Sequence, residues 1–295
     1  MMKVSICIPA YKHIDFLKRC INSVLEQDFL DYEVIITDDS PNNDLEKLVA
    51  TYNDDRIHYY KNNPALGSPE NWNAGLKRAR GEYIKILHHD DWFASPQSLR
   101  QYISMLDNDQ ESDIAFSASC DIDENSNRKE HIATQSSLSE IKDNPNILFT
   151  GNRLGAPSVC IFRNKKEYLF DPKLKWVVDT EFYIRLIKAR NNNFVYTTDI
   201  LTNIGISQYQ ITQLCTADIK LVLTEKIYLY DKLQLETESY RYKRSLLRTL
   251  GREKIWSYKT LKKLLPDCNI SLSPLDSAIA FYYFVKRKVH DVCCK

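Results

Sequence analysis

Short apolar runs and stretches of helical spacing alternate over roughly the first 110 residues. The runs predict buried strands at Val4–Ile8, Val34–Thr37, Arg56–Tyr60 and Tyr83–Leu87. Helical spacing is clearest in the first interval, where one stripe carries Ile14, Leu17, Ile21, Val24 and Leu25. Serine-proline pairs predict the starts of two later helices, at Ser68-Pro69 and Ser95-Pro96. This alternation predicts an α/β fold with a mostly parallel sheet and helices on both faces.

The pattern changes twice further along the chain. Residues 109–150 are polar and poorly periodic, apart from a strand predicted at Ile114–Ser119. Another strand is predicted at Ser158–Phe162 and a helix at Asp179–Arg190. From about residue 216 onward, Leu, Tyr, Lys and Arg recur at helical spacing. We therefore expect one α/β domain over residues 1–215 and a helical C-terminal region over residues 216–295.

Composition narrows the class of protein. Apolar residues make up 43% and charged residues 27% of the 295, which is typical of a folded chain. A net charge of +1 gives no basis for a nucleic-acid partner. The eight cysteines form no C-x-x-C pair, which favours free thiols in a reducing compartment. The apolar run Ala278–Val285 is too short to span a membrane and the N-terminal run too short for a signal peptide, so a cytoplasmic location is expected.

Acidic pairs follow two of the predicted strands, at Asp38-Asp39 and Asp90-Asp91. Ligands of open α/β sheets bind beyond the carboxyl ends of the strands, so both pairs can line one crevice. Adjacent carboxylates favour a hard cation such as Mg²⁺ or Mn²⁺, which bridges to substrate phosphates. A solvated turn is the alternative for Asp90-Asp91, although Trp92-Phe93 directly after it disfavours an open, wet turn.

Two further positions have a functional and a structural interpretation. Asp39 can accept a hydrogen bond from a nucleobase or a ribose, or it can form an Asx turn with its own backbone. Tyr11 follows Pro9-Ala10 at the end of the first predicted strand. Its ring can stack on a base or lie exposed in a loop. Neither position is decisive alone.

Taken in order, these segments resemble glycosyltransferase family 2, whose members are inverting nucleotide-sugar transferases of the GT-A fold. The resemblance covers roughly the first 210 residues, and the ordered series makes it specific. That series is Val4–Tyr11, Val34–Ser40, Gly67, Asn73, Gly75, Gly81–Ile84 and His88–Trp92. The resemblance implies a nucleotide-sugar half over about residues 1–110, an acceptor half over about residues 111–215, and the helical region beyond.

The resemblance also implies a role for each matching residue. The expected donor-binding residues are Pro9, Ala10, Tyr11, Asp39, Asn73, His89 and Asp90. Among them, Pro9 and Tyr11 would flank the base, Asp39 would hydrogen-bond it, and Asp90 would lie near the ribose. Asp91 would hold a Mg²⁺ or Mn²⁺ ion that bridges the diphosphate and offsets the charge of the departing nucleoside diphosphate.

Inversion requires a base on the face of the sugar opposite the leaving group. The family places an acidic residue at the head of a later helix, and Asp179 in Val178–Arg185 matches it. Asp is also a favoured N-cap, worth about 1 kcal/mol over Ala, and the two roles can coexist. Glu181 is the fallback base, although it points elsewhere on the helix. Trp176 is either an acceptor platform or a core anchor.

The chain departs from the family pattern at three places. His88 stands where the acidic motif often starts with a further Asp. A neutral imidazole there can bind a metal or a phosphate, or can pack under the strand end. Residues 203–212 lack the His that many members carry, so either Asp91 holds the ion with waters and phosphates or metal dependence is weak. Val178 replaces the usual acidic neighbour of the base.

The expected activity is that of an inverting glycosyltransferase. It would move a sugar from a UDP- or dTDP-sugar to a hydroxyl of a glycan or lipid-linked acceptor, in surface polysaccharide or lipopolysaccharide synthesis. A catalytically silent nucleotide-sugar binder or scaffold is the alternative, suggested by His88 and by the absent His. A sugar nucleotidyltransferase fits less well, because that class carries a glycine-rich loop after strand one and Pro9–His13 contains no glycine.

Basic clusters mark the C-terminal region, at Tyr240–Arg244 and Lys286–Lys288. Basic helices with aromatic residues can lie on an anionic membrane surface, which would place the protein peripherally on the inner face of the membrane. A solvated helix face, or packing on the α/β domain, explains the same pattern.

Overall fold

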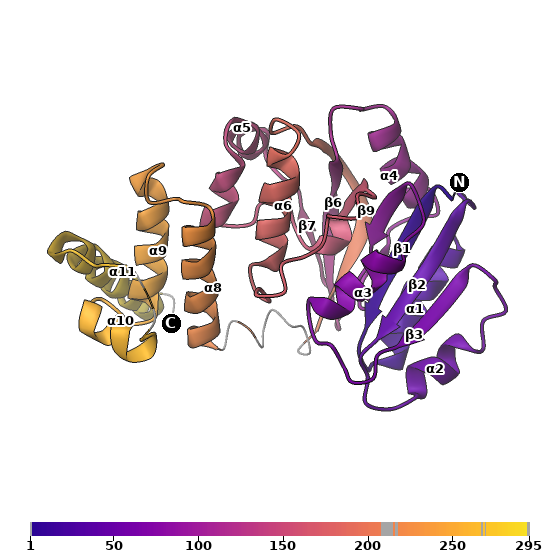
Figure 1. Ribbon diagram of the computed structural model, residues 1–295, viewed down its shortest axis with the longest axis horizontal. Helices are drawn as coiled ribbons and strands as arrows, with labels where there is room; N and C mark the ends of the chain where they lie inside the picture. The colour runs from indigo at the N-terminus through magenta and orange to yellow at the C-terminus, as the bar shows by residue number, and fades with distance from the viewer. Residues whose placement is uncertain (1, 208–214, 216–217, 267, 269, 294–295) are drawn as a thin grey trace. The chain divides into compact units, whose positions relative to one another are not determined.

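The computed structural model describes residues 2–207, 215, 218–266, 268 and 270–293, and for residues 287–293 it describes the backbone alone. The chain divides into two compact units (Figure 1). The first comprises Met1–Pro145, Asn152–Pro172 and Val178–Gln208. The second comprises Asn146–Gly151, Lys173–Val177 and Tyr209–Lys295. Two short segments from the middle of the chain therefore belong to the C-terminal unit.

A single sheet forms the frame of the first unit. Its nine described strands are ordered β3-β2-β1-β4-β8-β6-β9-β5, with β7 beside β6. Their bounds are β1 Val4–Ala10, β2 Tyr32–Asp38, β3 Ile57–Lys61, β4 Tyr83–Ile86, β5 Trp92–Phe93, β6 Ile114–Asp123, β7 Arg128–His131, β8 Cys160–Arg163 and β9 Val195–Ile206. The four strands β3-β2-β1-β4 are parallel, as predicted.

Beyond β4 the sheet is mixed instead of continuing mostly parallel. β8 runs antiparallel to both β4 and β6, while β6 and β9 are parallel. β5 and β7 add two more antiparallel pairs. The apolar pattern locates a strand but does not encode its partner when that partner lies far away in sequence, which is why the second half of the sheet differed from expectation.

Helices cover both faces of β1. Ile6 points to one face, in a core with Leu17 of α1, whereas Cys7 points to the other. On that second face α3 approaches so closely that a Cβ added to Gly75 would lie 3.5 Å from the Cys7 Cβ. The described helices of this unit are α1 Ile14–Leu25, α2 Asp44–Val49, α3 Glu70–Arg78, α4 Ser98–Asp107, α5 Gln135–Asp143 and α6 Val178–Lys188.

The serine-proline pairs do not cap helices as predicted. α3 begins at Glu70 with Pro69 at its N-cap position, and α4 begins at Ser98 with Gln97 there. Ser98 Oγ accepts a hydrogen bond from the Ser95 backbone N–H, which is the reverse of the expected cap. Both helices start later than the pairs predicted, because the fixed φ of proline also suits the turn before a helix.

The second unit is helical, as predicted. Its described helices are α8 Ile219–Lys232, α9 Tyr240–Arg252, α10 Tyr258–Leu264 and α11 Pro274–Cys293. Asp218, Ser239 and Ser257 cap three of them by accepting a hydrogen bond from a first-turn backbone N–H. α9 and α11 pack closely, since a Cβ on Gly251 would clash with the Ala280 carbonyl. Of the helices described, none combines the length and the apolar character needed to cross a membrane.

Candidate active site

The parallel strands carry several predicted site residues to one edge of the sheet. Ala10 at the end of β1 pairs with Asp38 at the end of β2. The backbone N–H of Asp39 donates to the Ala10 carbonyl at 3.1 Å, and that of Leu87 after β4 donates to the Cys7 carbonyl at 2.9 Å. The residues after β1, β2 and β4 therefore lie along the same carboxyl edge, where open α/β sheets bind ligands.

The turn after β4 brings three potential metal ligands together. His88, Asp90 and Asp91 each offer one ligand atom, and these atoms lie within 4.8 Å of one another. Asp91 is buried, and its Oδ1 accepts a hydrogen bond from the Gly205 backbone N–H at 3.0 Å. Burial raises the pKa of Asp91 well above its ordinary value, and the Asp90 charge raises it further. A cation at this turn would favour the ionised form of both carboxylates.

The two histidines of the turn have buried Nε2 atoms that lack a hydrogen-bond partner among the described residues. The ring centroids of His88 and Trp72 are 4.6 Å apart, and those of His89 and Phe16 are 6.3 Å apart. Burial lowers the pKa of His88 to about 4, so its imidazole is neutral near pH 7. His88 thus packs under the strand end and also keeps one nitrogen available as a ligand.

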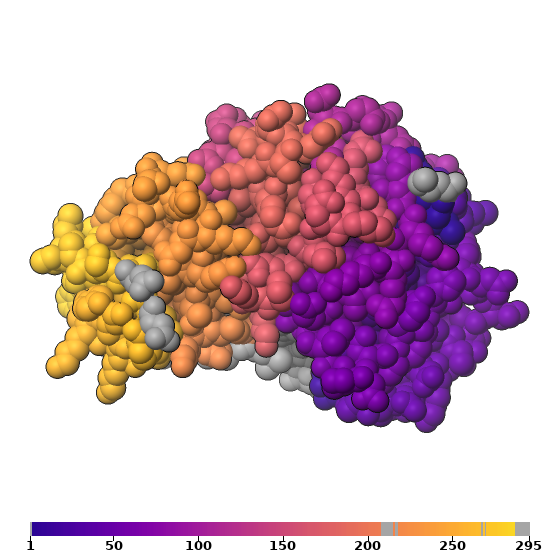
Figure 2. All heavy atoms as spheres, in the orientation of Figure 1, coloured from indigo at the N-terminus to yellow at the C-terminus, as the bar shows by residue number. Residues whose placement is uncertain are grey.

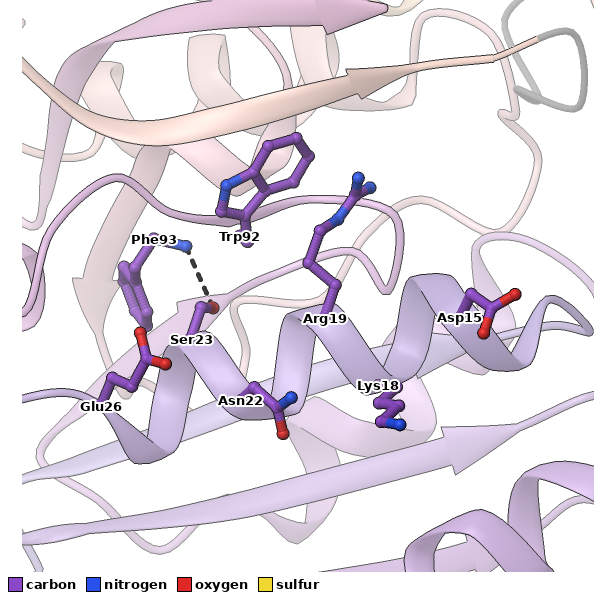
Figure 3. A pocket seen from close by; sticks show the side chains of 8 residues that line it. All are labelled: Asp15, Lys18, Arg19, Asn22, Ser23, Glu26, Trp92 and Phe93. Carbon is purple, nitrogen blue, oxygen red and sulfur yellow. Dashed lines mark hydrogen bonds between the residues drawn. The ribbon is translucent and has the colours of Figure 1, made fainter. Parts of the chain in front are cut away.

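An arginine from α1 braces the same turn. Arg19 donates a hydrogen bond to the Asp90 carbonyl at 2.8 Å, and its guanidinium lies 3.7 Å from the centroid of the Trp92 ring. Figure 3 shows Arg19 and Trp92 beside a hollow of about 350 Å³ along α1. None of the eight described residues that line it belongs to the predicted site. Arg19 at the rim of this hollow holds the acidic turn in position.

Lys85, which the sequence analysis did not single out, anchors the turn from β4. Its side chain is fully buried, and the ammonium donates hydrogen bonds to the carbonyls of Ile86 and Ser158. Burial lowers the pKa of Lys85 to about 8, against a smaller opposing electrostatic effect of the neighbouring acidic groups Cys160, Asp91 and Cys20. Ser158 Oγ accepts a hydrogen bond from the His88 backbone N–H at 2.9 Å, and the Ser158 side chain also hydrogen-bonds Asp91. A lysine inside the apolar run Tyr83–Leu87 was the available signal.

Asp38, in the other acidic pair, is surrounded by hydrogen-bond donors. Asp38 accepts hydrogen bonds from the Ser40 backbone N–H at 2.7 Å, the Tyr59 hydroxyl at 2.6 Å and the Lys61 ammonium at 2.9 Å. Burial by itself would raise the pKa of Asp38, but these hydrogen bonds outweigh burial and lower the pKa below its ordinary value. Asp38 is therefore stably ionised within the frame of the sheet.

Asp39 binds a neighbouring loop. Its carboxylate accepts hydrogen bonds from the Asn62 amide at 2.8 Å and from the backbone N–H groups of Leu66 at 3.1 Å and Gly67 at 2.7 Å. The Asx turn considered for Asp39 is made by Asp38 instead, which accepts from Ser40. Asp39 consequently fixes the loop over residues 62–67, and its side chain is only 7% exposed.

The three residues at the end of β1 differ in exposure. Pro9 and Ala10 are buried, whereas the Tyr11 side chain is 47% exposed. The Lys12 ammonium lies 4.8 Å from the centroid of the Tyr11 ring. Of these three, Tyr11 alone presents a side chain that can stack on a ligand.

Asn73, another residue predicted to bind the sugar donor, forms hydrogen bonds within the first unit. Its Nδ2 donates to the Phe170 carbonyl at 2.9 Å, and its Oδ1 accepts from the Phe170 backbone N–H at 2.8 Å. Asn73 is 2% exposed. These two hydrogen bonds join the Asn73 amide to both backbone groups of Phe170, as in a β-ladder, and so attach residue 170 to α3.

Asp179 lies in the first turn of α6. The helix begins at Val178, so Asp179 does not take the N-cap position that was its alternative role. Its Oδ1 accepts a hydrogen bond from the Thr180 backbone N–H at 2.6 Å, and its Oδ2 accepts from the Asn152 amide at 2.7 Å. Burial raises the pKa of Asp179 above its ordinary value, although these hydrogen bonds oppose the rise. A carboxylate with a raised pKa is suited to accept a proton near neutral pH.

One short segment connects Asp179 with the acidic turn. Asn152 Oδ1 accepts from the backbone N–H groups of Leu154 and Gly155, which folds residues 152–155 tightly. Six residues after Asn152, Ser158 contacts Asp91. The segment over residues 152–158 therefore touches Asp179 at one end and Asp91 at the other. The sequence offered no signal for it beyond its place between two predicted elements.

The remaining two predicted residues have other partners. Glu181 forms an ion pair with Arg185 one helical turn later, at 2.9 Å, and it is 2% exposed. Trp176 belongs to the second unit, and its backbone N–H donates to the Glu225 carboxylate at 2.8 Å. Glu225 also accepts from the backbone N–H groups of Lys175 and Val177. The backbone at Trp176 is thus fixed to α8, and its side chain is partly exposed.

The chain is similar in sequence to known glycosyltransferases. A family model described as "Glycosyl transferase family 2" matches residues 5–169, which is more than half of the chain. An uncharacterised glycosyltransferase of Rickettsia typhi is 27% identical over 218 residues, covering 72% of this chain and 67% of the relative. A Campylobacter jejuni protein, GalNAc(5)-diNAcBac-PP-undecaprenol beta-1,3-glucosyltransferase, is 37% identical over 94 residues, covering 31% of this chain and 30% of the relative.

Solved structures share the fold at low sequence identity. Staphylococcus aureus TarS 1-349 in complex with UDP-GlcNAc gives a TM-score of 0.59 at 18% identity, covering 90% of this chain and 76% of that one. The mannosyltransferase PcManGT from Pyrobaculum calidifontis, in complex with GDP-Man and Mn²⁺, gives 0.60 at 13% identity, covering 96% and 86%. These likenesses confirm the predicted GT-A fold. The family model, which matches more than half of the chain, shows that this glycosyltransferase belongs to glycosyl transferase family 2.

Proposed function

We propose that this protein is an inverting glycosyltransferase that moves a sugar from a UDP- or dTDP-sugar to a hydroxyl of a glycan or lipid-linked acceptor. The pathway would be the synthesis of a surface polysaccharide or lipopolysaccharide. Support for the donor comes from the UDP-GlcNAc and GDP-Man named in the complexes of the structural neighbours. Support for a lipid-linked acceptor comes from the undecaprenol named for the Campylobacter jejuni relative.

The donor would bind at the carboxyl edge of β1, β2 and β4, within about residues 1–110. The exposed Tyr11 ring offers a stacking surface for the base, beside buried Pro9 and Ala10. Asp39 accepts hydrogen bonds from the loop over residues 62–67, and its carboxylate has lone pairs left to accept one more hydrogen bond, from the nucleobase. Asp90 and His89, in the adjacent turn after β4, would face the ribose and the phosphates.

A divalent cation, Mg²⁺ or Mn²⁺, fits the turn after β4. Two observations support the fit: the buried Nε2 of His88 has no partner among the described residues, and the buried Asp91 has a raised pKa that a cation would reverse. Asp91, Asp90 and His88 would hold the ion with one nitrogen and two carboxylate ligands. When bound, the ion supplies positive charge against the diphosphate leaving group.

Asp179 would be the general base. The hydrogen bonds from Asn152 and Thr180 orient its carboxylate, and burial raises its pKa toward the working range of a base. Each carboxylate oxygen has more than one lone pair, so Oδ2 can accept the acceptor's hydroxyl proton while Asn152 remains bound. The contacts of the segment over residues 152–158 with both acids carry the proposal, because donor and base must face one sugar carbon.

Substitution of Asp179→Asn tests the proposal, with Asp199→Asn as the matched control on an exposed carboxylate of β9. Transfer from a radiolabelled UDP-sugar should fall about 10²- to 10⁴-fold in Asp179→Asn, since a positioned base contributes about that factor. UDP affinity, measured by calorimetry, should be unchanged in both variants. Transfer by Asp179→Asn at the unmutated rate would exclude Asp179 as the base.

The alternative is a silent nucleotide-sugar binder. A thermal-shift screen of UDP-, dTDP- and GDP-sugars, with and without Mn²⁺, identifies the donor because a bound ligand stabilises the folded state. Stabilisation without transfer or donor hydrolysis across a broad acceptor panel would favour the silent binder. Turnover of any donor that stabilises the protein would exclude it.

A further inference from the structure

The outward face of α11 is apolar, although a helix face in water is expected to be polar. Leu275, Phe281, Tyr282 and Val285 are between 41% and 66% exposed. Helical periodicity places these four side chains on one side of α11, and we call them the apolar face. The opposite side carries Ala280, which is buried where α11 meets α9.

Aromatic side chains from the preceding loop and α10 adjoin this face. The Trp256 ring lies 5.4 Å from the Phe281 ring and 4.8 Å from the Phe284 ring, measured between centroids. Tyr258, at the start of α10, is 47% exposed. Exposed apolar patches of this kind on a folded unit mark an interaction surface. The helices that carry it are yellow in Figure 2.

Cationic side chains are exposed on α9, α10 and α11 of the same unit. Arg244 of α9 is exposed and donates a hydrogen bond to the Tyr283 hydroxyl of α11 at 2.8 Å. Lys259 and Lys263 are exposed on α10, and Lys286 is exposed at the end of the described side chains of α11. Cationic groups around an apolar centre match the layered chemistry of a lipid surface, with phosphates outside and acyl chains inside.

The near-neutral net charge of the chain is the sum of a positive C-terminal region and a negative N-terminal region. Residues 216–295 hold 16 Lys and Arg against 9 Asp and Glu, whereas residues 1–215 hold 24 against 30. Among the described side chains of α11, Asp276 is the one acidic residue. It is buried and forms an ion pair with Lys243 at 3.0 Å. The exposed charge beside the apolar face is therefore positive.

We propose that α10 and α11 dock this protein on an anionic lipid surface. The apolar face would enter the boundary between headgroups and acyl chains, while Arg244, Lys259, Lys263 and Lys286 would contact the phosphates. Charge selects this occupant, because a second copy of the chain would bring like charges together around the same face. The inference extends the proposed function, since an acceptor carried on a lipid lies at such a surface.

Vesicle sedimentation of the full chain tests the inference without donor or acceptor, so its outcome is independent of whether glycosyl transfer is found. Sucrose-loaded vesicles would contain either phosphatidylcholine alone or phosphatidylcholine with about 30% phosphatidylglycerol. We expect binding to the anionic vesicles only, weakened when NaCl is raised from about 0.1 M to about 0.5 M. Equal binding to both vesicle types, or no binding to either, would overturn the proposal.

Two variant pairs separate the apolar and the electrostatic contributions. Phe281→Ser with Tyr282→Ser should lower the affinity for anionic vesicles at least about tenfold, whereas Leu30→Ser with Leu66→Ser, at exposed positions of the first unit, should not change it. Lys259→Glu with Lys263→Glu should also lower the affinity for anionic vesicles about tenfold at low salt. Lys129→Glu, an exposed position of the first unit, is the control and should leave this affinity unchanged.

Folding and self-association are checked in the same variants. Thermal unfolding of Phe281→Ser with Tyr282→Ser should match the unmutated chain, because both side chains are exposed. If sedimentation velocity instead shows an oligomer that this double variant dissociates, the face joins two copies of the chain and the lipid proposal is wrong.

Discussion

Two acidic pairs end parallel strands of one sheet, and they differ in almost everything except sequence. Asp38-Asp39 after β2 receives hydrogen bonds from side chains, a lysine and a loop backbone, and the pKa of Asp38 is lowered. Asp90-Asp91 after β4 lies beside two buried histidine nitrogens without partners among the described residues, and the pKa of Asp91 is raised. Asp38 of the first pair is fully hydrogen-bonded without a ligand, whereas the second pair is suited to bind a cation.

We propose that this difference separates structural carboxylates from those with a role in binding or catalysis. A carboxylate whose oxygens accept several hydrogen bonds from the protein, as in Asp38, has a structural role. Burial with few donors leaves a carboxylate whose charge must be stabilised by something that binds, as at Asp91, or whose proton affinity is increased, as at Asp179. The acidic dipeptide itself does not distinguish the two, so the donors around it decide.

The pH dependence of transfer gives the largest expected effect. Asp179 must be ionised to act as base, and its folded-state pKa is raised. Below that pKa, kcat should fall about tenfold per pH unit, and above it kcat should level off. Initial rates over about pH 4 to 8.5 at saturating donor would measure the profile. A rate that stays flat down to the ordinary pKa of an aspartate would place Asp179 with the structural carboxylates.

Substitution of Asp38→Asn should cost about 3 kcal/mol of unfolding free energy, because it leaves Lys61 and Tyr59 without their buried anionic partner. Since the folded-state pKa of Asp38 is lowered, the difference from the unmutated chain should be present above the ordinary aspartate pKa. It should disappear as the pH falls through the lowered value. Urea unfolding at several pH values measures both.

Asp179→Asn is the matched comparison, and the sign is reversed. A raised folded-state pKa means that the carboxyl contributes stability below its ordinary pKa and loses that contribution as the pH rises through the raised value. The unfolding temperature of Asp179→Asn relative to the unmutated chain should therefore rise as the pH goes from acid to neutral. A loss of stability as large as that of Asp38→Asn would refute the division into two groups.

Gly205→Ala should cost less unfolding free energy than Asp38→Asn, about 2 kcal/mol, because its Cβ would meet the Asp90 carbonyl and push the turn outward. Mn²⁺ or donor affinity should weaken together with stability. Gly151→Ala is the control, since a Cβ there has no atom within 4 Å. Unchanged ligand affinity in Gly205→Ala would show that the position of the turn is not critical. Calorimetry and thermal unfolding supply the two readings.

The sequence predicted the half of the fold whose contacts are nearly local. The run Val4–Ile8 and the helix over Ile14–Leu25 were legible because their periods are encoded in consecutive residues. Strands β6 and β8 were also predicted, at Ile114–Ser119 and Ser158–Phe162. Their antiparallel pairing was not predicted, nor were β5, β7 and β9, because the partners are distant in sequence or the strands are short. At the site, the acidic turn was predictable from its position at a strand end. Lys85 was visible as a lysine inside an apolar run, but its partners were not predictable, because its ammonium binds the backbone carbonyls of Ile86 and Ser158, which any residue type carries.

The segment over residues 152–158 has a practical consequence for anyone who redesigns this enzyme. Because Asn152 binds the carboxylate assigned as base and Ser158 binds the carboxylate assigned to the metal, the two are joined by a tether of seven residues. On the proposed roles of these two carboxylates, a change in the length of this tether should alter acceptor selection and donor binding together. Libraries that seek a new acceptor should keep both ends constant and diversify elsewhere.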